Sequence, residues 1–535
     1  MQNSANNQSA QPEQSQQTGR IEGGIDAIVI GGSADGLAAA AYLGKAGLHT
    51  VLVGAGKELG GRIVSREIAG GIEIVDGEHL VTQLDPDVIA DLDLYRHGLS
   101  FAARRLDTTY FFSDADALKL DGDLSKSALL SLEDDDDAAA LETFIKETLE
   151  LAHFLRPAFK TVHHADGGLA RKALDKLLSS APRDKAELIE FYLFSAATDV
   201  ISSRFADGPL KSLLLSEAVF RSGVAPHEPF SFMPYLRKLS GEAAGLQGAV
   251  AYPAGGAVAV VTALRRAAQL AKVDMRAATP VRSILIEGDR VAGVMLENGG
   301  QLRAPVVIAA CDAARAFLKM IGPGKIDIGL QRILAAHRPE FSTGRLHCVL
   351  KGVAQDDATR DNLKRRLFYA PSVEEVSEAF LEARAGRVPE KLIIEAIFPG
   401  SLDEEAELEG RQVMSVMAHP LPFDVNPDET RREEIRKQIL VNIEIFAEGL
   451  SDRVEVCDLR LPSDEAVMLG AEASAFAAKS NVMSQWALAA ATAQSGRITG
   501  FYFCGGEAQI GAGLCCSAAR GAAKAALRAY RKGVA

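Results

Sequence analysis

The chain has 535 residues, and at roughly 100–200 residues per domain this length predicts more than one folding unit. Hydrophobic residues make up 47% and charged residues 24%, a balance that predicts a large core and excludes wholesale disorder. The 71 acidic residues outnumber the 58 basic residues, and the formal net charge is −13. An acidic surface repels phosphate backbones, so no nucleic acid partner is expected.

The cysteines and histidines predict neither a disulfide scaffold nor a metal site. The chain has six cysteines, and Cys504, Cys515 and Cys516 lie close together without CxxC spacing. His163 and His164 are adjacent and would point in different directions on a helix or a strand. Reduced thiols and the absence of a targeting signal predict a cytoplasmic protein.

The first 24 residues are polar and rich in Gln, Asn and Ser, and we expect a disordered tail without the apolar region of a secretory signal. The longest uncharged stretch that resembles a membrane segment is 243–264. It contains four glycines and Pro253, which would break a spanning helix. We therefore expect no transmembrane segment, and a peripheral membrane contact stays open.

Regular structure is predicted to begin at Ile25 with a strand, a glycine turn, a helix and a second strand. Ile25–Ile30 is a short apolar run, typical of a buried strand, and Gly31–Gly36 follows as a turn. Ala34–Ala46 is rich in Ala and Leu, which favour a helix, and Thr50–Val53 is a second buried strand. This order predicts a βαβ unit.

The glycine turn resembles a dinucleotide-binding fingerprint, which has Gly at its first, third and sixth positions. Gly31 and Gly36 occupy the first and sixth positions, whereas the third is Ser33. In such a turn the free N–H groups of the helix N-terminus hold a phosphate. The serine is small and could donate its hydroxyl to a phosphate oxygen.

The end of the second strand departs from the same fingerprint. An acid that bonds the ribose hydroxyls normally stands there, but the position is Gly54 and the nearest acid is Glu58. Asp35 adds a negative charge at the helix N-terminus that would receive the phosphate. These departures predict weakened nucleotide binding.

Later segments predict further helices and strands. Residues 133–220 are expected to be mostly helical, and 256–271 is another helix. Val281–Ile286 and Val291–Leu296 flank Gly288 and Asp289, which favours a hairpin, and Val306–Ala310 is a buried strand. Strand-like runs then mix with a helix near 430–448, and residues 500–535 return to a strand, a glycine loop and a helix.

Four separated segments carry a family resemblance. Asp26–Arg62 includes the glycine turn and a double glycine followed by Arg62; the others are Asp91–Phe101, Tyr252–Leu264 and Gly500–Gly513. In this order they resemble the FAD-dependent phytoene-desaturase-like (phytoene dehydrogenase-related) oxidoreductases of the amine-oxidase-like flavoprotein superfamily. Each glycine alone would suit an ordinary turn, whereas four motifs in order are far more specific.

The resemblance implies FAD as the cofactor, weakly bound if Ser33 and Gly54 matter, and a hydrophobic small molecule as the partner. It implies no metal and identifies no catalytic acid or base, and the oligomeric state stays unknown. The implied cofactor-binding residues are Gly31, Gly32, Ser33, Gly36, Gly54, Gly60, Gly61, Arg62, Val281, Gly505, Gly506, Glu507, Gly513 and Leu514.

The implied fold is α/β, with a Rossmann-like FAD-binding domain built in three layers around a parallel central sheet. A mixed-sheet and helical substrate domain is interleaved with it in the chain. We expect the FAD-binding domain to comprise residues 25–132, 241–330 and 491–535. The substrate domain would comprise a helical insert at 133–240 and residues 331–490, after the tail at 1–24.

Three functions remain open on the sequence. The first is hydride transfer from an elongated isoprenoid- or polyene-like substrate to the flavin. Its tunnel would be lined by the apolar residues of the insert: Phe191, Tyr192, Phe194, Phe220, Phe230, Phe232, Tyr235 and Leu236. The second is a pseudoenzyme that has lost tight FAD binding and acts as a binding or regulatory protein. The third is an amine oxidase, for which the aromatic cage could come only from Phe501, Tyr502, Phe503 and Trp486.

Overall fold

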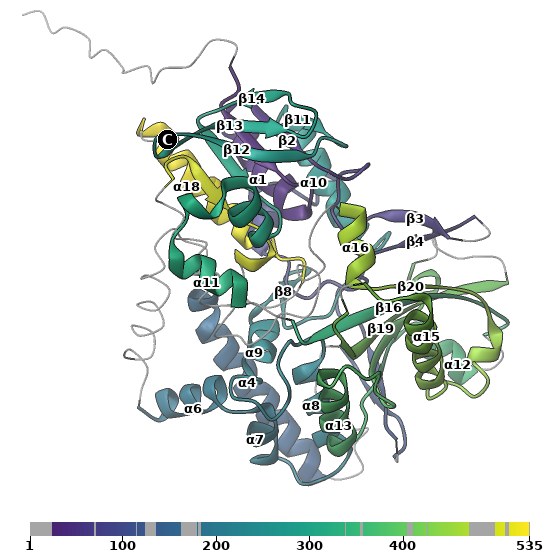
Figure 1. The fold of residues 1–535 in the computed structure, drawn as a ribbon. Coiled ribbons are helices and arrows are strands. Elements are labelled where there is room, and N and C mark those ends of the chain that lie inside the picture. Colours follow the sequence, from purple (N-terminus) through teal and green to yellow (C-terminus); the bar gives the residue numbers. More distant parts are fainter. Residues whose placement is uncertain are drawn as a thin grey trace, which may run out of the picture.

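The computed structural model describes residues 24–68, 71–113, 115–122, 135–161, 179, 183–336, 339–353, 357–403, 410–424, 426–469, 498–508 and 513–533. Residues 1–23 of the predicted tail and the pair His163 and His164 lie outside these ranges. Two main sheets organise the molecule, a five-stranded sheet in the upper part of Figure 1 and a seven-stranded sheet in the lower part. The fold is a mixed α/β fold with a parallel sheet, as predicted.

The five-stranded sheet is parallel and draws its strands from distant parts of the chain. Its order is β11 (Asp274–Arg276), β2 (Thr50–Val53), β1 (Ala27–Ile30), β15 (Val306–Ala309) and β21 (Phe501–Phe503). The residues of β1, β2 and β15 are all buried, which explains why these strands are apolar except at Thr50. The predicted βαβ unit is confirmed, with α1 (Ala34–Lys45) as its helix.

Helices and a β-meander surround this sheet. The helices α10 (Val258–Leu270) and α18 (Ser517–Arg531) both pack against α1, and α1 and α18 also contact strands of the sheet. The predicted hairpin is confirmed as β12 (Val281–Glu287) and β13 (Arg290–Leu296), extended by β14 (Gln301–Arg303). The meander contacts β15 and the helix η1 (Ala314–Ile321). Together these elements bury one continuous apolar core.

The seven-stranded sheet is mixed. Its order is β20 (Val454–Arg460), β16 (Phe341–Lys351), β19 (Arg411–Pro422), β18 (Ile393–Ile397), β17 (Arg366–Tyr369), β6 (Thr108–Phe111) and β7 (Leu118–Leu120). Only β17 and β6 pair in parallel. The helices of this region are α12 (Asp357–Leu363), α13 (Val373–Arg384), α14 (Pro399–Leu402), α15 (Glu429–Ile443) and α16 (Pro462–Leu469).

The insert is helical, as expected, and its helices share a second apolar core with the seven-stranded sheet. They are α4 (Asp135–Thr161), α6 (Arg183–Phe194), α7 (Ala197–Ser202), α8 (Pro209–Val219) and α9 (Met233–Ser240). The short strands pair as β3 (Ser65–Ile68) with β4 (Ile72–Val75), β5 (Phe101–Ala103) with β10 (Tyr252–Pro253), and β8 (Glu242–Ala243) with β9 (Leu246–Gln247). The remaining short helices are α2 (Pro86–Asp91), α11 (Ile328–Ala336), η2 (Pro323–Lys325), η4 (Ser451–Arg453) and η7 (Gly506–Ala508).

One feature of the predicted organisation differs from the structure. The prediction placed all of residues 25–132 in the FAD-binding domain, but β6 and β7 pair into the seven-stranded sheet. The remaining domain boundaries stay predictions. None of the described helices combines the length and apolar composition needed to cross a lipid bilayer.

Candidate functional site

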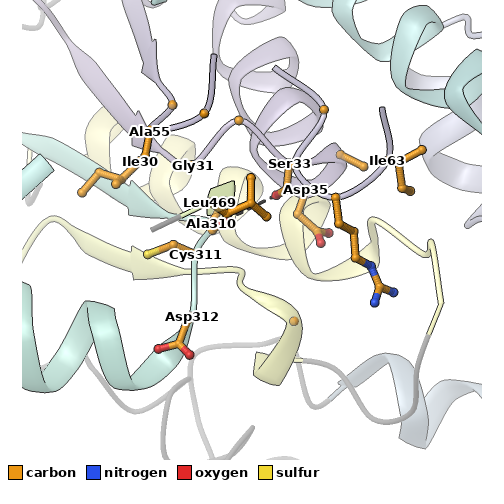
Figure 2. A pocket seen from close by; sticks show the side chains of 18 of the residues that line it. Ile30, Gly31, Ser33, Asp35, Ala55, Ile63, Ala310, Cys311, Asp312 and Leu469 are labelled. Atoms are coloured by element: carbon orange, nitrogen blue, oxygen red, sulfur yellow. Dashed lines mark hydrogen bonds between the residues drawn. The ribbon is translucent and has the colours of Figure 1, made fainter. Parts of the chain in front are cut away.

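A cavity of about 260 Å³ opens where β1, β2 and β15 end (Figure 2). The carboxyl ends of parallel strands are where α/β folds bind ligands. Ile30 and Gly31 follow β1, Gly54 and Ala55 follow β2, and Ala310 and Cys311 follow β15. Segments from both halves of the chain therefore meet around one hollow.

The glycine turn brings the start of α1 close against the strands. Gly31 has a φ of +112°, and a Cβ on it would lie 2.4 Å from the carbonyl oxygen of Ala310. A Cβ on Gly36 would lie 1.8 Å from the carbonyl oxygen of Gly31, so any side chain there would push the helix off the turn. The turn therefore leaves backbone, rather than side chains, along this wall of the cavity.

Ser33 is the N-cap of α1. Its Oγ accepts a hydrogen bond from the Gly36 N–H at 3.4 Å and donates one to the Ala310 carbonyl at 3.3 Å. The replacement of glycine by serine at the third fingerprint position thus supports the turn and its link to β15. The same side chain lines the cavity, beside Asp35 in the first helical turn (Figure 2).

Twelve of the fourteen predicted cofactor-binding residues line this cavity: Gly31, Gly32, Ser33, Gly54, Gly60, Gly61, Arg62, Val281, Gly506, Glu507, Gly513 and Leu514. Gly36 and Gly505 do not line it. Gly36 allows α1 to approach Gly31, and Gly505 allows a similar approach to β15, because its Cβ would lie 2.0 Å from the Cys311 carbonyl oxygen. Cofactor contact by the twelve stays a prediction.

The position at which the fingerprint normally has a ribose-binding acid also lies on the cavity wall. Gly54 lines the cavity at the end of β2, and the exposed Glu58 lines it as well. An acid four residues after the expected position therefore still faces the hollow. A Cβ on Gly54 would meet the Leu59 Cδ2 at 2.7 Å, which is the movable end of a side chain.

A cluster of charged side chains that the sequence did not predict lies at the side of the cavity that faces the seven-stranded sheet. Glu78, Arg221 and Arg345 line it together with Arg62 and Thr343, and they come from widely separated segments. Arg221 Nη1 and Nη2 donate to the Glu78 carboxylate at 2.7 and 2.8 Å, and Arg62 pairs with the same carboxylate. No local motif marks such a cluster, because only the tertiary fold brings these residues together.

The carboxylate of Glu78 stays ionised although its side chain is only 2% exposed. Burial alone would raise the pKa of Glu78, but the positive charges of Arg221 and Arg62 hold that pKa well below its usual range. The pKa of Arg221 is raised, because attraction to Glu78 outweighs its burial. Arg221 also has a φ of +62°, which is rare for a residue with a side chain.

Acidic residues elsewhere on the cavity belong to a different part of its wall. Burial raises the pKa of the Cys311 thiol to about 12, and the charges of Asp312 and Glu507 contribute to the rise. These groups follow β15 and β21, on the side of the parallel sheet. Arg315 also follows β15 and lines the cavity, and its charge opposes that rise, so acidic and basic groups stand together beside the parallel sheet. The stretch of the wall beside the seven-stranded sheet is rich in arginine.

The aromatic residues proposed for a substrate tunnel lie elsewhere. None of the described residues that line the cavity is aromatic. Tyr192, Phe232 and Leu236 are fully buried in the core of the helical insert, whereas Phe191 and Phe194 are 38% and 40% exposed. Phe220, Phe230 and Tyr235 pack against the same core. Six of the eight side chains therefore belong to a packed core, Phe191 and Phe194 are exposed, and none of the eight lines this cavity.

The aromatic residues considered for an amine-oxidase cage do not line the cavity either. Phe501 and Phe503 are buried and pack against Phe317, with ring centroids 5.6 and 5.3 Å away. Tyr502 is half-buried beside the same core, and Trp486 lies outside the described residues.

Residues 36–333, more than half of the chain, match the model of the flavin containing amine oxidoreductase family, and the chain belongs to that family. It is a phytoene-desaturase-like flavin-dependent oxidoreductase of the amine-oxidase superfamily, as the sequence motifs predicted.

Two curated relatives are similar to the chain. It is 24% identical over 582 residues to "Pyridine nucleotide-disulfide oxidoreductase domain-containing protein 2" of Mus musculus, a match that spans 96% of this chain and 95% of the relative. It is also 25% identical over 308 residues to the phytoene desaturase of Cercospora nicotianae, which spans 55% of this chain and 46% of that enzyme.

Solved structures share the fold. An oxidoreductase from Methanosarcina mazei superposes with a TM-score of 0.60 at 14% identity and covers 94% of this chain and 100% of its own. A triple mutant of putrescine oxidase superposes with a TM-score of 0.62 at 14% identity, and the match covers 95% of this chain and 99% of that enzyme. At this identity the likeness concerns the fold alone.

Proposed function

We propose that the protein binds FAD in the main cavity and oxidises a substrate by hydride transfer to the flavin. The observation that carries the proposal is the convergence of the N-terminal glycine turn, the double glycine before Arg62 and the C-terminal Gly506–Glu507 segment on one hollow. FAD, when bound, supplies the two-electron acceptor. The chain supplies binding, orientation and a site shielded from water.

The residues present fit a flavin dinucleotide. The turn at Gly31–Ser33 and the start of α1 offer backbone N–H groups to a pyrophosphate. Gly60 and Gly61 lie against this turn, where a Cβ on Gly61 would stand 3.1 Å from Ser33, so the wall is close-packed backbone. Val281 and Glu58 would hold the nucleoside end. Asp35 lies near the proposed phosphate site and would weaken binding by repulsion.

For the substrate we propose an elongated molecule with an apolar chain of isoprenoid or polyene type. The support is the similarity to relatives named phytoene desaturase and 1-hydroxycarotenoid 3,4-desaturase. We propose no amine substrate, because the described lining of the cavity holds no aromatic residue that could form a cage.

The visible spectrum of the purified protein tests the proposal. We expect the absorption bands of a bound flavin, either directly or after incubation with FAD. Acid release of the chromophore, followed by chromatography, would distinguish FAD from FMN. A protein that stays colourless at saturating FAD would contradict the proposal and support a pseudoenzyme.

Restoring the missing acid should tighten cofactor binding. We expect Gly54→Glu to lower the Kd for FAD about tenfold, because a carboxylate at the end of β2 can accept ribose hydroxyl hydrogen bonds. The Leu59 side chain can move aside for the new residue. Titration of FAD into the flavin-free protein by calorimetry measures this change. Gly54→Gln is the matched control for bulk, and an equal gain in both variants would contradict the role of charge.

A further inference from the structure

A second, much smaller cavity of about 20 Å³ is lined by the segment that leads into α18. Leu514 lines the main cavity, whereas Cys515 and Ser517 line the small one, so this segment contacts both. The Cys515 carbonyl accepts a hydrogen bond from the Asp85 N–H at 3.0 Å, which fixes the segment against the start of α2. A cavity of this volume has room for roughly one or two non-hydrogen atoms.

The Cys515 thiol has a hydrogen-bonded path for its proton. Ser517 Oγ donates to the Asp85 carboxylate at 2.6 Å, and Cys515 Sγ lies 3.0 Å from the same Ser517 Oγ. Because a hydroxyl has a single proton and Ser517 donates it to Asp85, the S–H is the donor in the contact with Ser517. The hydrogen bonds therefore run from the sulfur to a buried carboxylate, which can take up the thiol proton as the hydroxyl passes on its own.

The guanidinium of Arg237 faces the sulfur from the wall of the same cavity. Arg237 Nη2 donates to Cys515 Sγ at 3.6 Å, and Nη1 donates to Ser240 Oγ at 3.4 Å. Arg237 is only 6% exposed, and its Nε has no hydrogen-bond partner among the described residues. A positive charge beside a sulfur stabilises the negative charge that develops there as the proton leaves.

A second arginine on this cavity also has an unused donor. Arg156 Nη1 pairs with Glu242 at 3.2 Å, but the buried Arg156 Nη2 has no hydrogen-bond partner in the part of the chain that the structure describes. Buried donors require an acceptor, and a small molecule with oxygen atoms supplies one. The cavity therefore offers a sulfur nucleophile and unsatisfied N–H groups to a molecule of about two oxygen atoms.

We infer that Cys515 is a modification site at which hydrogen peroxide oxidises the thiol to a sulfenic acid. The sulfur attacks one oxygen of the peroxide, so that an S–O bond forms and the O–O bond breaks. The other oxygen leaves as hydroxide and takes up the thiol proton that passed through Ser517 to Asp85, which gives water. The sulfur loses two electrons and the peroxide gains them. This reaction goes beyond the proposed function and requires no flavin.

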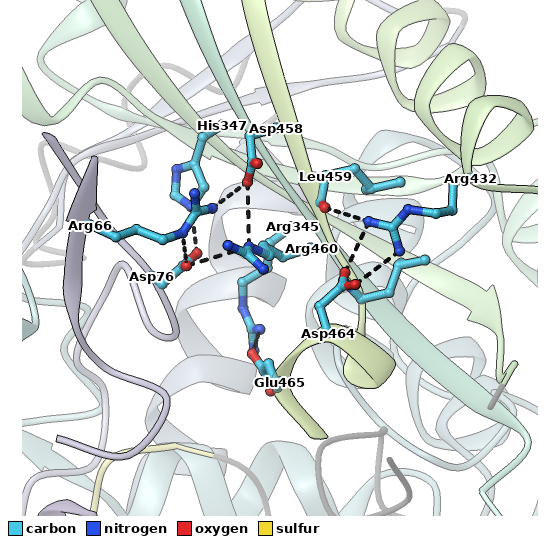
Figure 3. Close-up of polar contacts among 11 residues, drawn as sticks. Arg66, Asp76, Arg345, His347, Arg432, Asp458, Leu459, Arg460, Asp464 and Glu465 are labelled. Carbon is cyan, nitrogen blue, oxygen red and sulfur yellow. Dashed lines mark hydrogen bonds and ion pairs between the residues drawn. The ribbon is translucent and has the colours of Figure 1, made fainter. Parts of the chain in front are cut away.

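The half-buried Cys457 in β20 is an internal control for accessibility. Burial raises the pKa of the Cys457 thiol, and the charges of Glu433 and Asp458 add to the rise against the effect of Arg436. Figure 3 shows the neighbouring Asp458 in the ion-pair network of the seven-stranded sheet. If accessibility alone decided oxidation, Cys457 would react before the buried Cys515.

Site-resolved oxidation of the full-length protein tests the inference. The protein is treated with hydrogen peroxide, catalase stops the reaction at set times, and the chain is then unfolded in urea with dimedone, which captures sulfenic acids. Mass spectrometry of the peptides measures the rate at each cysteine. We expect Cys515 to be oxidised at least about tenfold faster than Cys457. An equal or faster reaction of Cys457 would overturn the inference. Because no flavin is needed, the result is independent of the spectrum that tests the proposed function.

A pair of substitutions at Ser517 tests the path of the proton. Ser517→Ala removes the acceptor of the thiol proton, whereas Ser517→Thr keeps a hydroxyl at this position. We expect the alanine variant to slow the oxidation of Cys515 about tenfold and the threonine variant to retain most of the rate. The rate at Cys457 should stay unchanged in both variants, which shows that they remain folded. An unchanged Cys515 rate in Ser517→Ala would contradict the role of this path.

The charge beside the sulfur is tested by Arg237→Met, which should slow the oxidation of Cys515 about tenfold. Arg237→Lys keeps a cation and should recover part of the rate. The matched control is Arg432→Met, because Arg432 pairs with Asp464 at 3.0 Å and lines neither cavity (Figure 3). Equal rates in the native protein and Arg237→Met, or equal slowing in both methionine variants, would overturn the inference.

Discussion

Replacing Arg366 with methionine is expected to lower the free energy of unfolding by about 3–5 kcal/mol. Arg366 is 1% exposed and lies in β17, where its guanidinium pairs with Glu217 and with Glu395, the latter at 2.6 Å. Its Cζ also lies 4.3 Å from the centre of the Phe368 ring. Removal of this cation would leave two carboxylates buried beside each other with too little positive charge.

The same substitution should change how stability depends on pH. Burial would raise the pKa of Glu217, but Arg366 and Lys238 lower it to about 2, so in the native protein this carboxylate stabilises the fold above pH 4.5. That stabilisation is lost as the pH falls from 4.5 toward 2. Without Arg366 the pKa of Glu217 in the folded protein rises. The difference in unfolding free energy between the native protein and the variant should therefore become smaller as the pH falls from 7.5 to 4.

Denaturant unfolding at pH 7.5 and at pH 4 measures both effects. Arg365→Met is the matched control, because the neighbouring Arg365 pairs with the 45% exposed Asp361 and should contribute less than about 1 kcal/mol. Arg366→Lys keeps the charge and should recover part of the loss. A deficit for Arg366→Met no larger than that of the control would show that the buried network does not stabilise the fold.

The parallel-sheet half of the fold could be predicted because its signals are local. The apolar run at Ala27–Ile30, the glycines of the turn and the Ala-rich helix lie within one short stretch, and each feature has a direct physical reason. The hairpin around Gly288 was predicted for the same reason. Of the twelve predicted residues that line the cavity, seven are glycines, which mark places where backbone comes close to backbone or to a ligand.

The arginine cluster could not be predicted, because nothing near Arg221 or Arg345 in the sequence marks a site. Their partners Glu78 and Glu465 are more than one hundred residues away. The sheet position of β6 was missed for a related reason, since its neighbour β17 comes from a distant part of the chain. Long-range pairing of this kind leaves no periodic signal in a single sequence.

The aromatic residues of the helical insert show the opposite error. Tyr192 and Phe232 resemble the lining of an apolar tunnel, and the structure buries both in a core with Phe144. Composition alone cannot separate a packed core from a lined cavity, because both need large apolar side chains. Only the fold decides which surfaces meet.

Stability should fall by about 3 kcal/mol between pH 8 and pH 4.5 through His419 alone. This side chain is fully buried, and burial lowers its pKa to about 3 from an ordinary value of 6.5. Below pH 6.5 the unfolded chain binds a proton at this residue and the folded protein does not, so acid favours the unfolded state. An ordinary pKa of 6.5 and a folded-state pKa of about 3 set an upper bound of about 5 kcal/mol, of which about 3 kcal/mol is lost by pH 4.5.

The variant His419→Asn isolates this effect. In the native protein, the ring Nδ1 lies 3.1 Å from the Ser342 carbonyl oxygen and 3.3 Å from the Thr343 hydroxyl, and an asparagine amide can replace part of these contacts without titrating. The variant should be less stable than the native protein at pH 8, and the difference should shrink by about 3 kcal/mol as the pH falls to 4.5. Other titrating groups are common to both proteins and cancel in the difference. Urea unfolding at half-unit pH steps measures this difference. If the difference in unfolding free energy between the two proteins stays constant with pH, His419 is protonated in the folded protein as readily as in the unfolded chain.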